Sequence, residues 1–166
     1  MPSDLPKIRI DEAVEVMLAG MKALGITIGA AKGDLKLTPE GVKIGELAAR
    51  LSGGFMSSHT FPISTGINLH KAAIEIGLGE EPSDLKPSKK LVCIERAIIG
   101  EPGRFESIEG VEDVKKLPNV EEVIITKKEG DKIEKLTSNI GKVGHIIISA
   151  PTLLEAEKVY ENAKKH

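Results

Sequence analysis

Two acidic residues, Asp34 and Glu46, have the spacing of partners across a β-hairpin. Residues 26–50 show a hairpin pattern, and a turn centred on Glu40 predicts pairs whose numbers add up to 80. Residues directly opposite in an antiparallel pair have Cβ atoms about 4.5–5.5 Å apart, where like charges are destabilising. Two carboxylates in this arrangement are therefore solvated, share a proton or hold a cation.

Magnesium is the cation that such a pair would suit, because it is usually held by one or two carboxylates together with water and phosphate oxygens. Arg50 follows Glu46 by four residues, so it points to the same face and could pair with a carboxylate or clamp a phosphate. Two alternatives stay open. A register shift of one residue would separate Asp34 from Glu46, and charged residues on an edge hairpin are commonly only solvated.

The next segment offers groups that could contact an anion. Ser52 and Gly53 open a Ser-, Gly- and Thr-rich stretch, and glycines allow close approach of the backbone to an anion. The alternative is that residues 51–66 are simply a surface loop. His59 and His70 have no partner at metal-ligand spacing in the sequence.

The composition limits the class of protein. The 166 residues are 40% hydrophobic and 29% charged, which suits one globular domain or two small ones. A formal net charge of −2 and 2% aromatic residues argue against nucleic-acid binding. Cys93 lies in an apolar stretch and is predicted to be a buried small hydrophobe. Without a signal-peptide pattern or an apolar run of spanning length, we expect a cytoplasmic protein that does not enter a membrane.

A helix is predicted before the hairpin, over residues 11–24. Asp11 and Glu12 would lie in its first turn, and Gly25 would follow its last. Its apolar stripe is predicted to consist of Val14, Met17, Leu18, Met21 and Leu24.

The hairpin strands are expected at about 26–37 and 42–49. The predicted pairs nearest the turn are Thr38 with Val42 and Lys36 with Ile44.

The remaining pattern predicts an α+β fold. A helix at 67–78 precedes a Pro-rich, charged linker at 79–90. Strands are then predicted at 91–99, 120–126 and 143–149, followed by a helix at 152–165 that opens with a Thr-x-x-Glu capping box. We therefore expect a helix, hairpin and helix in residues 1–82, and a small, mainly antiparallel β domain with a terminal helix in residues 83–166.

The segment Glu46-Leu47-Ala48-Ala49-Arg50 resembles the Glu-x-Asn-x-Arg motif of ATP-grasp enzymes. Asp34, twelve residues before Glu46, resembles the acidic residue that completes this pattern in biotin carboxylases and their relatives. Residues 53–79 resemble the loop and helix that close the ATP-grasp domain, and residues 95–103 resemble part of the small C-terminal domain of biotin carboxylases. The chain is thus similar, over almost its whole length, to the C-terminal part of an ATP-grasp ligase of the biotin carboxylase and carbamoyl-phosphate synthase-like superfamily.

This resemblance implies Mg²⁺ and ATP as cofactors. It implies that Asp34 and Glu46 hold magnesium on the ATP phosphates and that Arg50 is catalytic at the phosphoryl-transfer or substrate site. Arg50, Ser52 and Gly53 would contact the nucleotide. Ala48, however, stands where the family has an asparagine that is a magnesium ligand.

The resemblance begins late in the ATP-grasp pattern, since no glycine-rich phosphate loop or lid sequence precedes Asp34. Phosphoryl transfer needs positioning and charge neutralisation from all sides. We therefore expect the C-terminal half or subunit of an ATP-dependent carboxylate–amine or carboxylase-type ligase, inactive alone and completed by a partner chain. The alternatives are a non-catalytic structural module that forms a homo-oligomer, and a fragment of a longer gene. Nothing in these residues identifies the substrate.

Overall fold

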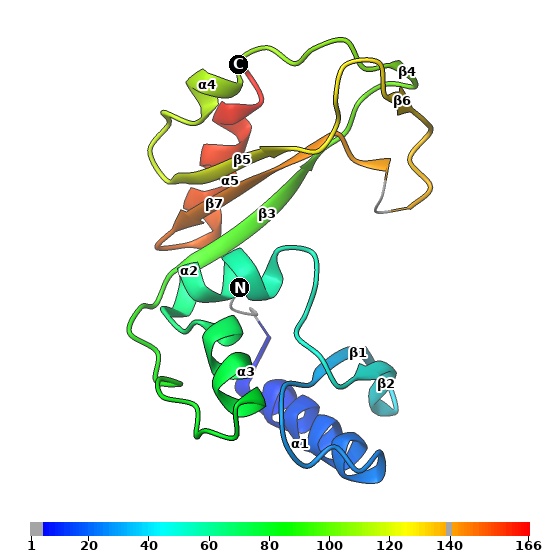
Figure 1. The fold of residues 1–166 in the computed structure, drawn as a ribbon, viewed down its shortest axis with the longest axis vertical. Coiled ribbons are helices and arrows are strands. Elements are labelled where there is room, and N and C mark those ends of the chain that lie inside the picture. Colours follow the sequence, from blue (N-terminus) through cyan, green and yellow to red (C-terminus); the bar gives the residue numbers. More distant parts are fainter. Residues whose placement is uncertain (1–4, 139–140) are drawn as a thin grey trace. The chain divides into compact units, whose positions relative to one another are not determined.

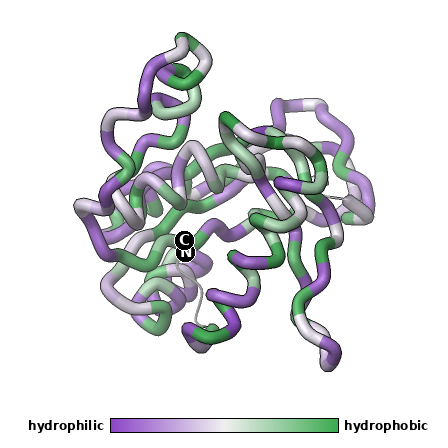
Figure 2. Tube along the Cα trace, turned by 90° about the horizontal axis from the view of Figure 1, so that it is seen from below, coloured by the Kyte–Doolittle hydropathy of each residue, from purple (hydrophilic) through white to green (hydrophobic). Residues whose placement is uncertain are grey.

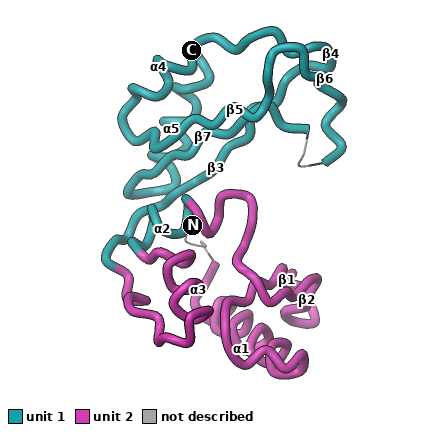
Figure 3. The backbone as a smooth tube through the Cα atoms, viewed as in Figure 1, with its two compact units in different colours: residues 1–2, 59–66, 88–166 teal, residues 3–58, 67–87 magenta. Residues whose placement is uncertain are grey.

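The computed structural model describes residues 5–138 and 141–166, which form two compact units. The first unit in chain order comprises residues 5–58 and 67–87, drawn in magenta as unit 2 in Figure 3. The second comprises the described residues among 59–66 and 88–166, drawn in teal as unit 1. The units are defined by packing alone, and the predicted domain boundary between residues 82 and 83 stays a prediction.

The chain is a mixture of helices and antiparallel strands, as predicted (Figure 1). The elements of the first unit are α1 (Lys7–Ala23), β1 (Lys32–Thr38), β2 (Gly41–Ala48) and α3 (Leu69–Gly77). A π-helical turn, η1 (Met56–Thr60), crosses from the first unit into the second. The elements of the second unit are α2 (Phe61–Thr65), β3 (Val92–Ile98), β4 (Gly103–Arg104), α4 (Val111–Val114), β5 (Val120–Ile125), β6 (Lys132–Ile133), β7 (Gly144–Ala150) and α5 (Leu153–Ala163).

Helix α1 begins four residues earlier than predicted, directly after Pro6. The prediction that Asp11 and Glu12 lie in the first turn is therefore wrong, because an additional turn precedes them. The end of the helix is as predicted. Leu24 caps α1, and Gly25 follows with a φ of 69°, a left-handed conformation that glycine adopts without steric cost.

Helix α1 packs on the β1–β2 hairpin at close range. A Cβ atom on Gly20 would lie 2.6 Å from the Cδ1 atom of Ile44, so the missing side chain at residue 20 is what allows this approach. A polar contact fixes the same interface, because Glu12 Oε1 accepts a hydrogen bond from the backbone N–H of Val42 at 2.9 Å.

The predicted apolar stripe of α1 is wrong in part. Met17 lies against Gly33 of β1, so it faces the hairpin. Val14, Leu18 and Leu24 instead have 51%, 58% and 62% of their surface exposed. Apolar residues occur on more than one side of this helix, and the shape of the hairpin decides which of them are covered.

The β1–β2 hairpin has a two-residue turn, Pro39-Glu40, rather than a turn centred on one residue. Thr38 therefore pairs with Gly41, and the next pairs are Leu37 with Val42 and Lys36 with Lys43. The predicted pairs of Thr38 with Val42 and of Lys36 with Ile44 are wrong by one residue.

A β-bulge farther along the hairpin restores the predicted register. Leu35 pairs with Ile44 and Asp34 with Glu46, which leaves Gly45 without a partner across the ladder. The pairing of Asp34 with Glu46 is thus confirmed, although its cause is the extra residue in β2 and not the turn.

The prediction of a loop over residues 51–66 is wrong in its second half. Residues 56–60 form η1, and residues 61–65 form the short helix α2, with Pro62 in its first turn, where its missing N–H costs nothing. The helix predicted next is confirmed as α3, and the side chain of Asn68 caps it by accepting a hydrogen bond from the N–H of Lys71 at 2.9 Å.

The three long strands predicted in the second half are confirmed, and they form one antiparallel sheet in the order β3-β7-β5. Helix α5 packs on this sheet and opens with the predicted capping box between Thr152 and Glu155. The buried core that joins this sheet to α5 and α4 consists of Ile94, Val114, Val123, Ile146, Ile148, Ala150, Ala156 and Ala163. Cys93 is buried as predicted, with 1% of its surface exposed.

Helix α4 and the two-stranded ladder of β4 and β6 were not predicted from the sequence. The linker at residues 79–90 is irregular as expected, and Ser83 ties it to α3 by donating its N–H and its hydroxyl to the Glu75 carboxylate. Hydrophobic and hydrophilic residues alternate in short stretches along the described trace (Figure 2), and none of its helices combines the length and apolarity needed to cross a membrane.

Candidate functional site

The predicted acid pair belongs to a group of four residues, two on each strand, on one face of the hairpin. The register pairs Asp34 with Glu46 and, one step farther from the turn, Lys32 with Ala48. Residues two apart on a strand point to the same face, so the four side chains share one surface. Gly33, between Lys32 and Asp34, faces α1, so the cluster lies on the opposite side of the hairpin.

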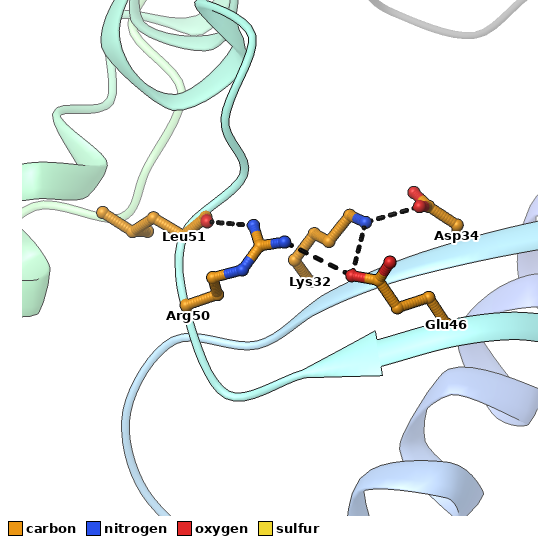
Figure 4. A network of polar contacts seen from close by, with 5 residues as sticks. All are labelled: Lys32, Asp34, Glu46, Arg50 and Leu51. Atoms are coloured by element: carbon orange, nitrogen blue, oxygen red, sulfur yellow. Dashed lines mark hydrogen bonds and ion pairs between the residues drawn. The ribbon is translucent and has the colours of Figure 1, made fainter. Parts of the chain in front are cut away.

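The cation of this cluster is the ammonium group of Lys32. Its Nζ atom lies 2.5 Å from Asp34 Oδ2 and 3.1 Å from Glu46 Oε1, so it bridges the two carboxylates (Figure 4). The Lys32 side chain is only 10% exposed, whereas the side chains of Asp34 and Glu46 are 62% and 53% exposed. The lysine is thus packed along the strand surface, and the acids remain open to solvent.

Arg50 joins the cluster from just beyond the end of β2. Its Nη2 atom lies 3.3 Å from Glu46 Oε1, the oxygen that also contacts Lys32, and its Nη1 atom donates to the carbonyl oxygen of Leu51 at 3.1 Å (Figure 4). The sequence analysis placed Arg50 on the same face as Glu46, and this is confirmed. The formal charges of Lys32, Asp34, Glu46 and Arg50 add up to zero.

The cluster holds Lys32 in its charged form. The hydrogen bond to Asp34 is the main cause that raises the pKa of Lys32 above its ordinary value; desolvation opposes it, and the hydrogen bond to Glu46 adds to it. The contacts with the two acids therefore favour the ammonium form of Lys32.

Ser52 and Gly53 lie at the start of the following loop. Gly53 accepts a hydrogen bond from the N–H of Met56 at 3.2 Å, which closes a turn containing Gly54 and Phe55. Both central residues are left-handed, with φ angles of 61° and 62°. This conformation is uncommon for a bulky residue such as phenylalanine, so the turn is held in a strained form.

His59 and His70 do not join the cluster. His59 belongs to the second unit, where its Nε2 atom lies 2.8 Å from Glu122 Oε2. His70 is an exposed residue on α3.

The acid pair suits a magnesium ion only in part. Two carboxylates supply hard oxygen donors, which is sufficient where phosphates and water complete the coordination. Ala48 contributes no donor, and Lys32 already contacts both acids. Within residues 5–138 and 141–166, no group of three or more His, Cys, Asp or Glu side chains is arranged to hold a metal ion. The two acids would therefore fit a metal only where phosphate and water supplied the remaining ligands and Lys32 were displaced.

Known proteins resemble this chain in sequence and in structure. Residues 96–166 match the family model described as L-amino acid ligase C-terminal domain 2. The uncharacterized protein y4rH of Sinorhizobium fredii is 21% identical over 162 residues, which are 98% of this chain and 34% of that protein. This chain therefore spans about a third of that curated relative.

Two solved structures superpose on nearly the whole chain. An L-amino acid ligase from Bacillus licheniformis has a TM-score of 0.84 and 26% identity, covering 99% of this chain and 43% of that one. This is the fold of the C-terminal part of an ATP-grasp ligase. A phosphoribosylglycinamide synthetase from Anaerococcus prevotii agrees, with a TM-score of 0.82, 22% identity and coverage of 99% and 42%. The chain thus corresponds to less than half of each of these two structures.

The residue that the sequence analysis missed is Lys32. A signal for it was present, because Lys32 precedes Asp34 by two residues and so must share its face of the strand. In the structure the two acids are partly exposed and both contact the ammonium group of Lys32, a cation that the chain itself supplies.

Proposed function

We propose that this chain is the C-terminal part of an ATP-dependent ligase that activates a carboxylate, and that its hairpin cluster contacts the phosphates of Mg-ATP. The single observation that carries the proposal is that Asp34 and Glu46 face each other on one side of the hairpin, with Arg50 in contact with Glu46, in a chain with an ATP-grasp C-terminal fold. The rest of the ATP-binding pocket is supplied by the remaining parts of an ATP-grasp enzyme, carried by a partner chain.

The acidic and the basic residues of the cluster would contact different parts of the ligand. Asp34 and Glu46 would hold the divalent ion, which when bound neutralises phosphate oxygens and orients the transferred group. Arg50 has five N–H donors in a planar fork, which suits bidentate contact with a phosphate or an acyl phosphate. Its present partners, a shared carboxylate oxygen and one carbonyl, leave donors available for such a ligand.

The substrate class follows from the printed names of the relatives rather than from the cluster. The family model and one solved structure are named for L-amino acid ligases. We therefore propose an amino acid carboxylate as the group that is activated and an amine as the group that attacks it.

Calorimetry with Mg-ATP tests the proposal. It is done on the chain alone and on the chain mixed with a candidate partner that carries the remaining ATP-grasp parts, sought first in the neighbouring reading frame. We expect heat of binding only with the partner, and its loss on Glu46→Gln or Arg50→Ala. Clear binding by the chain alone would contradict the need for a partner, and no binding in the mixture would contradict the catalytic role.

A second function, as a non-catalytic oligomerisation module, is favoured by one observation. Helix α1 leaves Ile8, Val14 and Leu18 with more than half of their surface exposed, and apolar patches of this kind often bind another protein. Light scattering distinguishes this candidate: a homo-oligomer that dissociates on Leu18→Glu supports it, and a monomer at all concentrations contradicts it.

A further inference from the structure

The small residue opposite Lys32 leaves room for the lysine side chain on the surface of the hairpin. Its partner across the ladder is Ala48, whose side chain is a single methyl group, so the lysine stem can lie along the strand surface without a clash. From there its ammonium group reaches Asp34 on its own strand and Glu46 diagonally across the hairpin. Diagonal neighbours in an antiparallel pair are within reach of long side chains.

This arrangement removes the repulsion that the register creates. Two carboxylates directly opposite each other destabilise a hairpin unless a cation lies between them. The Lys32 ammonium contacts both, at 2.5 and 3.1 Å, and it is the least exposed of the three charged groups. Arg50 forms its ion pair with Glu46 rather than with Asp34, so it does not bridge the two carboxylates as Lys32 does.

We propose that Lys32 is the resident cation of the Asp34–Glu46 pair, and that a divalent ion binds these carboxylates only by displacing it. This inference rests on the proposed function in taking the pair as metal ligands. It goes further because it assigns Lys32 the role of an intramolecular competitor of the divalent ion. The hairpin is then stable without metal, and metal binding is coupled to the release of the lysine side chain.

The consequence is a weaker metal site than the acid pair alone would make. Displacement breaks two partly exposed ion pairs, which corresponds to about a two- to thirtyfold loss in affinity for the ion. The released ammonium group remains tethered beside the cluster, where it can contact an anion.

The test compares Mn²⁺ and Mg²⁺ binding by the intact chain and by Lys32→Met and Lys32→Gln. The matched control is Lys36→Met, which removes the same charge from the same face of β1, opposite Lys43. Calorimetry gives the affinity, and thermal unfolding in chelator or in millimolar metal gives the stability. Glu46→Gln identifies the binding that belongs to this cluster.

We expect both Lys32 variants to bind the ion about two- to thirtyfold more tightly than the native chain and Lys36→Met. We also expect them to melt lower in chelator and to recover when metal is added. Equal affinity in the native chain and both Lys32 variants overturns the inference, and so does the absence of metal binding in all of them.

These results are independent of the Mg-ATP experiment. Tighter metal binding by the Lys32 variants without ATP binding by the assembly would leave the inference standing and remove the proposed function. Mg-ATP binding by the assembly, with no effect of the Lys32 variants on metal affinity, would remove the inference and leave the proposed function standing.

Discussion

Asp34 and Glu46 face each other because the residue before Glu46, Gly45, has no partner in the ladder. With the two-residue turn and strict alternation, Gly45 would lie opposite Asp34 and Glu46 would point toward α1. The bulge keeps Ile44 and Leu47 toward the helix and turns Glu46 outward. The candidate site therefore depends on one unpaired glycine.

Engineered cysteine pairs test this register. In a Cys93→Ala background, Asp34→Cys with Glu46→Cys is expected to form a disulfide on air oxidation, because directly opposed residues have suitable Cα separations. The matched pair of Lys32→Cys with Leu47→Cys, which would be opposed without the bulge, is expected to remain largely reduced, because Leu47 pairs with Gly33 and points to the other face. Thiol counting by mass spectrometry measures both, and faster oxidation of the Lys32–Leu47 pair would mean that the bulge is misplaced.

The pKa of Lys32 predicts a loss of stability at high pH. A folded-state pKa raised above the ordinary 10.5 contributes stability that is complete below about pH 10 and is lost as the pH rises through the folded value. Urea unfolding between pH 8 and about pH 11.5 should therefore show a steeper decline for the native chain than for Lys32→Met. An equal decline in the free energy of unfolding with pH for the two proteins would contradict the ion pairs of Lys32 with the two acids.

The thiol of Cys93 is expected to be unreactive in the folded protein. Burial raises its pKa to about 11, so very little thiolate is present at pH 8, and the sulfur is shielded from reagents. A disulfide reagent should modify it slowly in buffer and rapidly in denaturant. Rapid modification in buffer would show that the β3–β7 region opens readily.

The capping box of α5 provides a test of the second unit. The Thr152 hydroxyl accepts a hydrogen bond from the N–H of Glu155 at 3.2 Å, so Thr152→Ala should lower the free energy of unfolding by about 1 kcal/mol. Thr137→Ala, at an exposed position in an irregular segment, is the control and should change it by less than about 0.5 kcal/mol. Chemical denaturation of both variants decides whether the cap stabilises this unit.

The sequence was most informative where a local rule fixes a local structure. The capping box, the glycine after α1 and the long strands of the sheet each follow from a few neighbouring residues. The acid pair was predicted as well, but two errors cancelled: the turn is one residue shorter, and the bulge at Gly45 adds one. A bulge depends on how both strands pack, which a single strand pattern does not record.

Other features depended on tertiary partners. Val14 and Leu18 are as apolar as Met17, so only the surface of the hairpin determines which side of α1 is buried. Helix α2 was taken for a loop because its Ser and Thr residues are typical of loops, although Pro62 in its first turn was a usable signal. Lys32 was missed because the acids were analysed as a pair, without the other residues of the same face.

The order of the strands in the β3-β7-β5 sheet affects when the second unit can fold during synthesis. Among the described residues, strands β3 and β5 each pair with β7, which lies between them and follows both in the chain. During synthesis neither outer strand has its neighbour until residues 144–150 have left the ribosome. The contacts that close this sheet join residues far apart in the chain, and such contacts slow folding. The hairpin of the first unit, whose strands are joined by two residues, is free to form well before the sheet does.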